Sequence, residues 1–517
     1  MKKLIFNLFM TMLVLTVIVG CSNGTSSPNN STPDDTTSSN SKGKEQAETN
    51  GDRPTIVFYT NEHPSWPTNK EWLVWDLMEE GGNINLDIKI APDPWAESLN
   101  LTIASGDLPD LLRMTYQLGN KYGQDGALIN LLDHIDQMPN LKAWMEEYPL
   151  DARRAISHDG KMYTSPNVGI GETNRMLWLY RKDIFDKHGL EAPKNWDELY
   201  TVLTELKKQY PESYPFGFRN GTDKLVNFAP NFETSWNYYY DYDKDEWRYG
   251  PIEDNYRVMI EYMNKFYEEK LIPPDFLSTD TEQWQQLMST DTSFITQDYI
   301  GRIDMFNAPN RETNPDYTII NMPPPAGFTN GKQLDYYAHI NDAGYSVAVT
   351  TKNLEAVLGF IDWTFSEEGR DTLSWGVEGE TYEVENGEKK WIQEYPSPSE
   401  LRTDTGLSLF GTYSWFDYDA HMALFSDEVK KAYEDDPQYD APVVPVPAFT
   451  DEEQEIIAIK GEAIAKHRDE EIAKFIIGKR DFSEWDAYVE EIKKLGIDEM
   501  LEIHTKAYKR MLEVELN

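Results

Sequence analysis

Hydrophobic and polar positions follow two different rhythms in the chain after residue 52. Residues 53–60 (RPTIVFYT) and 83–92 (NINLDIKIAP) are rich in apolar and β-branched side chains, and the second segment alternates them with polar ones, which predicts two strands. Between them, residues 71–82 carry apolar side chains at helical spacing and end in a glycine pair, which predicts a helix. Residues 94–114 add a helix, a turn and a short strand. This order predicts a parallel sheet with helices on its faces.

Helical patterns dominate the later part of the chain. The clearest begins at Asn195, which can cap a helix, with Glu198 placed three residues later as in a capping box and Leu199 opening an apolar stripe. Further helices are predicted at 254–276, where a proline pair ends the pattern, at 352–373, and through most of 451–516 with breaks at Gly478 and Gly496, and a strand is predicted at 343–351.

The N-terminal residues show a targeting pattern. The positive start MKK and the uncharged apolar run at 4–20 are typical of a secretory signal peptide. The run ends in IVGC, which resembles a bacterial lipobox, so we expect acylation of Cys21, the single cysteine of the chain. A signal-anchor with an incidental cysteine is the alternative. Residues 22–52 are polar and lack large apolar side chains, which predicts a flexible tether.

Charge and composition exclude several classes of function. With 90 acidic and 48 basic residues the formal net charge is −42, which argues against nucleic-acid binding and against electrostatic docking to anionic lipid. A lone cysteine excludes an intramolecular disulfide and a cysteine-based metal site. The chain carries no H-E-x-x-H, G-x-S-x-G, P-loop or G-x-G-x-x-G signature. We therefore predict that it is not an enzyme, with a surface glycan hydrolase or lyase kept as an alternative, since a glycosidase-like acid pair has no recognisable sequence signal here.

Two loops and several aromatic residues are candidates for ligand binding. Sugars present flat apolar faces rimmed by hydroxyl groups, so a sugar site needs aromatic planes beside hydrogen-bonding side chains. The loop NEHPSWPTN follows the first strand, and the turn ASGDLPDLL is expected at the carboxyl edge of the parallel sheet, where ligands bind in such folds. The predicted ligand-binding residues in these loops are Asn61, Glu62, His63, Trp66, Ser105 and Asp107. Aromatic candidates in other expected loops are Trp236, Trp284, Trp375 and Tyr382, and Trp415 lies in a further loop. Packing inside the protein is the alternative for each of them.

Several segments carry motifs that occur together in one protein family. The segment LWLYRKDIFDKHGLEAPKNWDELY contains an R-K-D triplet at 181–183 and a P-x-x-W-x-E-L match at 193–199, and ASGDLPDLL supplies S-G-D-x-P-D at 105–110. These motifs resemble extracellular solute-binding proteins of family 1. The segments SEEGRDTLSWGVEGETYE and FIIGKRDFSEWDAYVEEIKKLGIDEMLEIHTKAYKRM resemble the long lipoprotein-type subgroup that is common in Gram-positive bacteria. The resemblance extends over essentially everything after the tether.

The resemblance implies an α/β protein with the two-lobe, type II periplasmic-binding-protein-like fold. Each lobe is then a mostly parallel sheet flanked by helices, with the ligand cleft between the lobes. We expect a signal peptide at 1–20, the lipidated Cys21 with its tether at 21–52, an N-terminal lobe at 53–168 plus 318–366, and a C-terminal lobe at 169–317 plus 367–517.

The resemblance also implies the function and the partners. It predicts a monomeric receptor on the extracellular face of the cell membrane, lipid-anchored, that captures an oligosaccharide and delivers it to the membrane subunits of an ABC importer. A peptide receptor on the same fold is the alternative. We expect no cofactor. Alginate-type members of the subgroup carry an EF-hand-like calcium loop soon after the long helix, but this chain reads KKQYPESYPFGFRNG there, which argues against calcium and against the uronate ligand that members with this loop often bind. An acidic sugar would need local basic residues, for which Arg113, Arg175 and Arg302 are the candidates. The segment DYDKDEWRYG at 241–250 fails the calcium pattern and predicts a hairpin turn.

Overall fold

The computed structural model describes residues 53–62, 66–92, 94–168, 175–337, 343–409 and 411–513. Residues 53–517 form one compact unit, separate from residues 1–52. The predicted sites Cys21 and His63 lie outside the described residues. Within the described ranges, no helix combines the length and the apolar character needed to cross a membrane.

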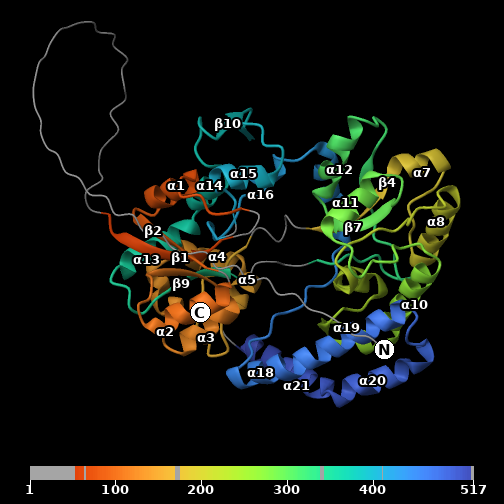
Figure 1. Cartoon of the computed structure of the whole chain (residues 1–517). Coiled ribbons are helices and arrows are strands. Elements are labelled where there is room, and N and C mark those ends of the chain that lie inside the picture. The colour runs from red at the N-terminus through yellow and green to blue at the C-terminus, as the bar shows by residue number, and fades with distance from the viewer. Residues whose placement is uncertain are drawn as a thin grey trace, which may run out of the picture. The chain divides into compact units, whose positions relative to one another are not determined.

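The first sheet has four strands in the order β2-β1-β3-β9 (Figure 1). Strand β1 (Thr55–Asn61) pairs in parallel with β2 (Asn85–Ala91) and with β3 (Leu111–Thr115), whereas β9 (Ala343–Val347) runs antiparallel to β3. Every second residue of β1 is buried, starting at Ile56, which gives the strand one face in the core. The β-α-β order predicted for residues 53–114 is therefore confirmed.

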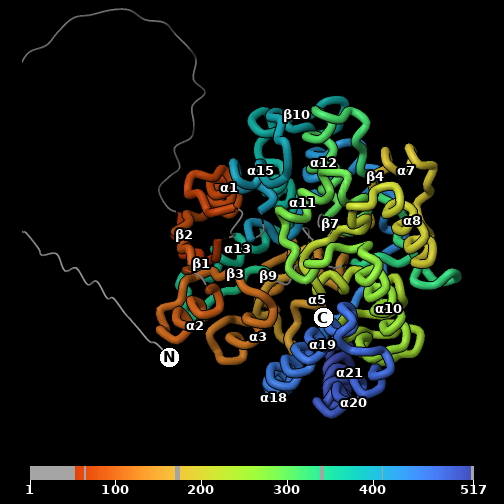
Figure 2. Tube along the Cα trace, turned by 45° about the vertical axis from the view of Figure 1, so that its right-hand side comes forward, coloured from red at the N-terminus to blue at the C-terminus, as the bar shows by residue number. Residues whose placement is uncertain are grey.

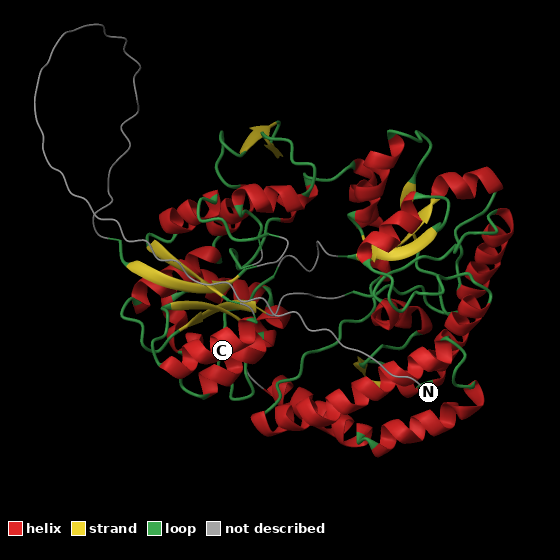
Figure 3. Ribbon diagram, in the orientation of Figure 1, coloured by secondary structure: helices red, strands yellow, loops and turns green. Residues whose placement is uncertain are grey.

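Helices pack on this sheet or on the helices that cover it (Figure 3). They are α1 (Leu73–Gly81), α2 (Trp95–Ser105), α3 (Tyr116–Gln124), α4 (Pro139–Glu147), α5 (Pro149–Arg154), α13 (Leu354–Thr364) and α14 (Glu367–Trp375). The single helix predicted at 352–373 is thus two helices. Ser366 separates them, because its side chain accepts a hydrogen bond from the backbone N–H of Gly369 and caps α14.

The second sheet has three strands in the order β7-β4-β8, and its strands are antiparallel. Strand β4 (Met176–Arg181) lies between β7 (Ile295–Tyr299) and β8 (Ile319–Met322). The mostly parallel sheet expected in each lobe is therefore found only in the first. A single parallel bridge, between Phe216 and Ile295, borders the second sheet. Helices of this region are α7 (Lys182–His188), α8 (Trp196–Gln209), α9 (Leu225–Phe228), α10 (Asp254–Glu268), α11 (Thr281–Ser289) and α12 (Arg302–Arg311).

Two local predictions in this region are confirmed. The side chain of Asn195 accepts from the backbone N–H of Glu198 at 2.9 Å and caps α8. Residues 238–249 form a hairpin of β5 (Tyr238–Asp241) and β6 (Glu246–Tyr249), as the failed calcium pattern indicated. Among the described residues no cluster of three or more His, Cys, Asp or Glu side chains could hold a metal ion.

The C-terminal helices lie side by side below the second sheet and the helices around it (Figure 2). They are α18 (Asp451–Ile456), α19 (Glu462–Ile476), α20 (Trp485–Lys494) and α21 (Ile497–Glu513), with a π-helical turn at Ile457–Gly461. The breaks predicted at Gly478 and Gly496 are both present, with φ values of 70° and 102°. Glycine adopts this left-handed conformation without the steric penalty of a Cβ atom.

The core packing differs in two places from the predicted lobe division. Strand β8 pairs with β4, so residues 319–322 belong to the second sheet and not to the region of β9. Conversely, Leu373, Leu401 and Phe416 lie in the core of the first sheet. Two elements that the expected boundary placed with the C-terminal lobe, α14 and α15 (Pro398–Thr405), therefore pack with the first. The remaining strands and α-helices are the hairpin of β10 (Tyr382–Glu385) and β11 (Glu388–Trp391), α16 (Tyr418–Met422) and α17 (Asp427–Asp435).

Candidate ligand-binding site

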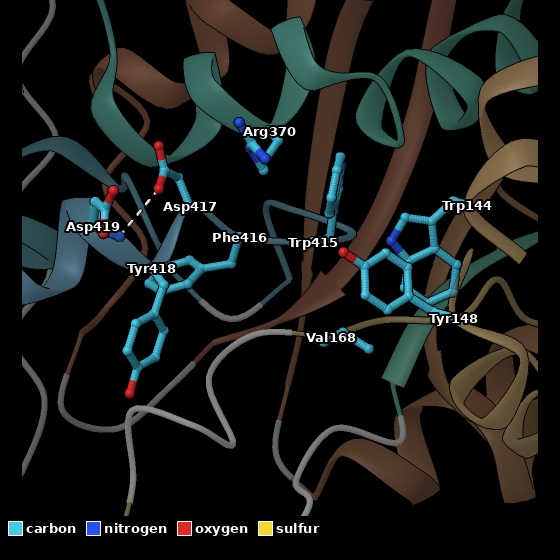
Figure 4. Close-up of a pocket in the computed structure, with 9 residues that line it drawn as sticks. All are labelled: Trp144, Tyr148, Val168, Arg370, Trp415, Phe416, Asp417, Tyr418 and Asp419. Atoms are coloured by element: carbon cyan, nitrogen blue, oxygen red, sulfur yellow. Dashed lines mark hydrogen bonds between the residues drawn. The ribbon is translucent and has the colours of Figure 1, made fainter. Parts of the chain in front are cut away.

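A pocket of about 300 Å³ lies where segment 415–425 joins two hydrophobic cores. Tyr418 packs against both the core of the first sheet and the smaller core beside α12. Residues from four parts of the chain line the pocket: Trp144, Tyr148, Val168, Arg370, Trp415, Phe416, Asp417, Tyr418 and Asp419 (Figure 4). We call this the aromatic pocket.

Aromatic rings form one wall of the aromatic pocket. The rings of Trp144 and Tyr148 lie 5.0 Å apart, and Tyr148 meets Trp415 edge-on at 6.1 Å. The guanidinium group of Arg370 lies 4.8 Å from the Trp415 ring centre, within the range of a cation–π contact. Because this contact and the edge-on ring of Tyr148 hold Trp415, its indole is a fixed surface on which an apolar face of a ligand can stack.

Hydrogen-bonding groups surround these rings. The indole N–H groups of Trp144 and Trp415 are buried, and neither has a hydrogen-bond partner among the described residues. A buried donor without a partner costs about 1–3 kcal/mol, and an acceptor oxygen on a ligand would relieve that penalty once a shift of the lining side chains brings it into contact. Burial, followed by the charge of Glu147, raises the pKa of Tyr148, so its hydroxyl stays protonated at neutral pH. The pocket therefore offers donors beside flat apolar faces.

Two carboxylates complete the lining. Asp417 accepts hydrogen bonds from the indole N–H of Trp375 at 2.8 Å and from the backbone N–H of Asp419 at 3.1 Å, and the ammonium group of Lys389 lies 3.7 Å away. These contacts fix the Asp417 carboxylate. Burial lowers the pKa of Arg370, but the hydrogen bond to Asp371 and the nearby carboxylate charges, including that of Asp417, together outweigh burial and raise the pKa of Arg370. Acceptors and a permanent cation thus face the same space, the arrangement that binds hydroxyl groups.

The pocket residues are held from behind by backbone hydrogen bonds. Asp362, on α13, accepts from the backbone N–H groups of Asn140 and Leu141 at 2.8 and 3.0 Å. This contact caps α4 and thereby sets the position of Trp144. Val168 donates its N–H to the carbonyl of Ser414 at 2.9 Å, so the two chain segments that enter the pocket are fastened to each other.

The structure places the described residues of the first predicted loop at the carboxyl end of β1, apart from the aromatic pocket. The side chain of Asn61 accepts from Arg113, and Glu62 is exposed. Trp66 donates from Nε1 to Ser399 Oγ at 2.7 Å. This loop packs near α15 and does not line the aromatic pocket.

Ser105 and Asp107 lie at the opposite edge of the sheet from the one expected. Ser105 ends α2, and the turn leads into the start of β3. Since β1 and β3 are parallel, this turn lies at the amino edge, whereas Asn61 lies at the carboxyl edge. Both residues are exposed, and the Ser105 hydroxyl accepts from the backbone N–H of Asp107 at 3.1 Å. The turn therefore stabilises itself and is not a ligand loop at the carboxyl edge.

The other predicted aromatic residues are spread over the molecule. Trp284 is on α11 with no exposed surface and donates to Thr296 Oγ1. Trp375 ends α14 and is 1% exposed. The expectation that these two side chains lie in loops is wrong, because both are core residues. Trp236 packs under the guanidinium of Arg468 at 4.0 Å, and Tyr382 begins β10 beside Trp375. Of these, Trp375 reaches the pocket indirectly, through its hydrogen bond to Asp417.

The sequence reasoning missed Trp144, Tyr148 and Arg370 as site residues. Trp144 belongs to the buried stripe of α4, and an aromatic residue at helical spacing is normally part of the core. Arg370 is one of many charged residues on α14. Trp415 was recognisable as a loop aromatic, but no local signal joined it to α4. A loop Trp flanked by Tyr413, Phe416 and Asp417 was the one usable hint.

Comparison with known proteins decides the family. The family model of the bacterial extracellular solute-binding proteins matches residues 70–371, which is more than half of the chain. The chain belongs to the bacterial extracellular solute-binding protein family. As predicted, members of this family are substrate-binding proteins and not enzymes.

Relatives of this solute-binding protein cover nearly its whole length. The fructooligosaccharide ABC transporter substrate-binding protein FusA of Streptococcus pneumoniae is 24% identical, over 88% of this chain and 90% of that protein. The polygalacturonan/rhamnogalacturonan-binding protein YtcQ of Bacillus subtilis is 23% identical, over 84% and 87%. A solved HMO-binding solute-binding protein from Bifidobacterium longum infantis superimposes with a TM-score of 0.74 at 18% identity, covering 89% of this chain and 99% of that one. The predicted type II solute-binding fold is confirmed.

Proposed function

We propose that this solute-binding protein captures an oligosaccharide outside the cell and delivers it to an ABC importer. The observation that carries the proposal is the aromatic pocket, where fixed indole faces and unpartnered N–H donors lie beside carboxylate acceptors. Sugars combine apolar ring faces with hydroxyl groups that donate and accept, so one sugar residue satisfies all three features at once. Relatives named for binding fructooligosaccharide and polygalacturonan support the same class of ligand.

The proposal includes attachment to the outer face of the membrane through a lipid on Cys21. The support is the signal-like start, the cysteine at its end and the polar residues 22–52. A receptor tethered to the surface that holds its importer meets it at a raised effective concentration. We also propose that the protein acts as a monomer.

Titration with a panel of oligosaccharides tests the ligand class. Intrinsic tryptophan fluorescence and thermal shift are recorded with fructans, plant cell-wall oligosaccharides and host-type glycans, and with a mixed peptide library as the comparison. We expect a saturable fluorescence change and a rise in Tm with at least one saccharide, and none with peptides. A response to peptides alone would establish the alternative receptor class, and release of shortened products from a polysaccharide would establish a hydrolase or lyase.

A further inference from the structure

Three cations surround one buried carboxylate at the end of β7. Arg219 donates to both oxygens of Asp298, from Nε at 2.8 Å and Nη2 at 3.0 Å, and Arg302 donates from Nε at 2.9 Å. The ammonium group of Lys224 lies 4.0 Å from the same carboxylate. We call Arg219, Lys224, Arg302 and Asp298 the cation cluster. The elements β7, α11 and α12, which hold Asp298, Arg302 and the rings of Trp284 and Tyr299, lie together in both Figure 1 and Figure 2.

The cation cluster carries more positive than negative charge. Burial lowers the pKa of Lys224 to about 8, so most of it remains protonated at pH 7. The next carboxyl group, Asp335, is 1% exposed, and burial together with Asp436 raises its pKa well above its usual range. Among the described residues, Asp298 is the carboxylate within 4.0 Å of these cations, and the raised pKa of Asp335 weakens the charge with which it could compensate them. One carboxylate leaves this charge uncompensated, in a chain whose formal net charge is −42.

Several donors of the cation cluster lack good protein acceptors. Lys224, with a 2% exposed side chain, has as its hydrogen-bond acceptor the sulfur of Met176, 3.8 Å away. Arg302 gives Nη1 to the sulfur of Met305, and within the described ranges its Nη2 has no protein acceptor. Its side chain is 23% exposed. Thioether sulfur is a weak acceptor, so an oxygen atom of a ligand would form stronger hydrogen bonds with these donors. The exposed part of the Arg302 side chain gives a ligand access to them.

The two arginines are also fixed in orientation. Their guanidinium groups lie 5.2 and 5.5 Å from the Trp284 ring and 5.8 and 5.6 Å from the Tyr299 ring. Asp298 holds each guanidinium by its Nε group. Because both forks are held by the protein itself, little side-chain entropy is lost when an anion binds. The buried Trp284, predicted as a ligand-stacking residue, supports these arginines from below.

The chain joins the cation cluster to the aromatic pocket. Segment 415–425 contributes Tyr418 to the pocket and Phe425 to the core beside α12. The next residue, Ser426, donates its backbone N–H to Asp304 of α12 at 3.0 Å. The helix that begins with Arg302 is therefore fastened to the segment that forms the pocket wall.

We propose that the cation cluster binds the carboxylate of an acidic sugar residue, so that the oligosaccharide contains a uronic acid. A guanidinium fork matches a carboxylate with two parallel hydrogen bonds, which are stronger than bonds to a neutral hydroxyl. The inference rests on the proposed function, since it assumes that the ligand is a saccharide. Holding Asp298 in place does not by itself account for the cluster, because one of the two bonded arginines would balance its charge.

The test compares an acidic saccharide with its own neutral form. Trigalacturonic acid and the same trisaccharide after chemical reduction of its carboxyl groups are titrated into the mature protein by calorimetry, at low and at high NaCl. We expect the acidic form to bind at least tenfold more tightly, with an advantage that shrinks in high salt. In Arg302→Gln we expect the ratio of the two affinities to fall about tenfold, and Arg302→Lys, which keeps the charge but loses the fork, should fall in between.

A matched control and the remaining outcomes separate this inference from the proposed function. Arg257→Gln removes a half-exposed arginine of α10 that pairs with Glu261, and it should leave the affinity ratio unchanged. Equal or tighter binding of the reduced trisaccharide, or of other neutral saccharides, overturns the uronic-acid inference and leaves the saccharide receptor standing. Binding of no saccharide, acidic or neutral, overturns both. If the ratio of acidic to neutral affinity fell equally in Arg257→Gln and Arg302→Gln, the cause would be a general charge effect. That result would also refute the cation cluster as the carboxylate site.

Discussion

The indole of Trp415 should supply a large part of the binding energy in the aromatic pocket. Replacing it with alanine removes the stacking face and an N–H donor that has no partner within the described ranges. A large aromatic side chain buries about 150–250 Å², and a sugar ring covering one face hides about 80 Å² of it, or about 2 kcal/mol at ~25 cal/mol per Å². The hydrogen bond adds about 1 kcal/mol. The total of about 3 kcal/mol corresponds to a loss of affinity of about 150-fold.

Two substitutions at this position separate the contributions. Trp415→Phe keeps an aromatic face but removes the donor, so we expect only about a fivefold loss, corresponding to ~1 kcal/mol. Trp415→Ala should lose both. Binding of the best saccharide from the panel is measured by calorimetry, because fluorescence itself changes when an indole is removed, and circular dichroism checks that each variant is folded.

Trp247→Phe is the matched control for this pair. It removes another buried indole N–H that lacks a hydrogen-bond partner in the part of the chain that the structure describes, on β6 and away from the pocket lining. We expect an unchanged affinity. If folded Trp415→Ala bound the saccharide within threefold of the unmodified protein, the aromatic pocket would not be the binding site and the stacking argument would be refuted.

Three further predictions concern anchoring and stability. Cys21→Ser should abolish incorporation of labelled palmitate and membrane retention, and retention of both would refute acylation at this position. Asp362→Ala should lower the free energy of unfolding by about 1–3 kcal/mol in urea titration, because two backbone N–H groups at the start of α4 lose their acceptor, and an unchanged midpoint would contradict this role. Asp335 has a raised pKa in the folded chain, so folding retains a proton that the unfolded chain releases, and stability falls as pH rises from the ordinary aspartate range toward the folded pKa. The Tm of Asp335→Asn minus the Tm of the unmodified protein should therefore be more positive at pH 8 than at pH 5. An equal Tm difference at both pH values would be evidence against a raised pKa of Asp335.

The strands β1, β2 and β3 of the first sheet and several caps were predictable because they depend on neighbours in sequence. The strand rhythm of β1 and β2, the cap at Asn195 and the breaks at Gly478 and Gly496 are local features. Each follows from side-chain periodicity or from backbone conformational preference, which act over a few residues. The antiparallel pairing of β4 with β7 and β8 was not predictable in this way, because the partners come from distant parts of the chain.

The candidate site shows the same division. The sequence by itself determined the family resemblance, the signal-like start with its cysteine and the demand for aromatic and polar side chains together. It also nominated Trp284 and Trp375 as ligand contacts, and the tertiary structure placed both in the core, where they support Arg302 and Asp417 instead. Only the fold could bring Trp144 of α4 to Trp415, across more than 250 residues of sequence. Hydrophobic periodicity tells which face of an element is buried, but which distant element covers that face is decided by the packing of the whole core.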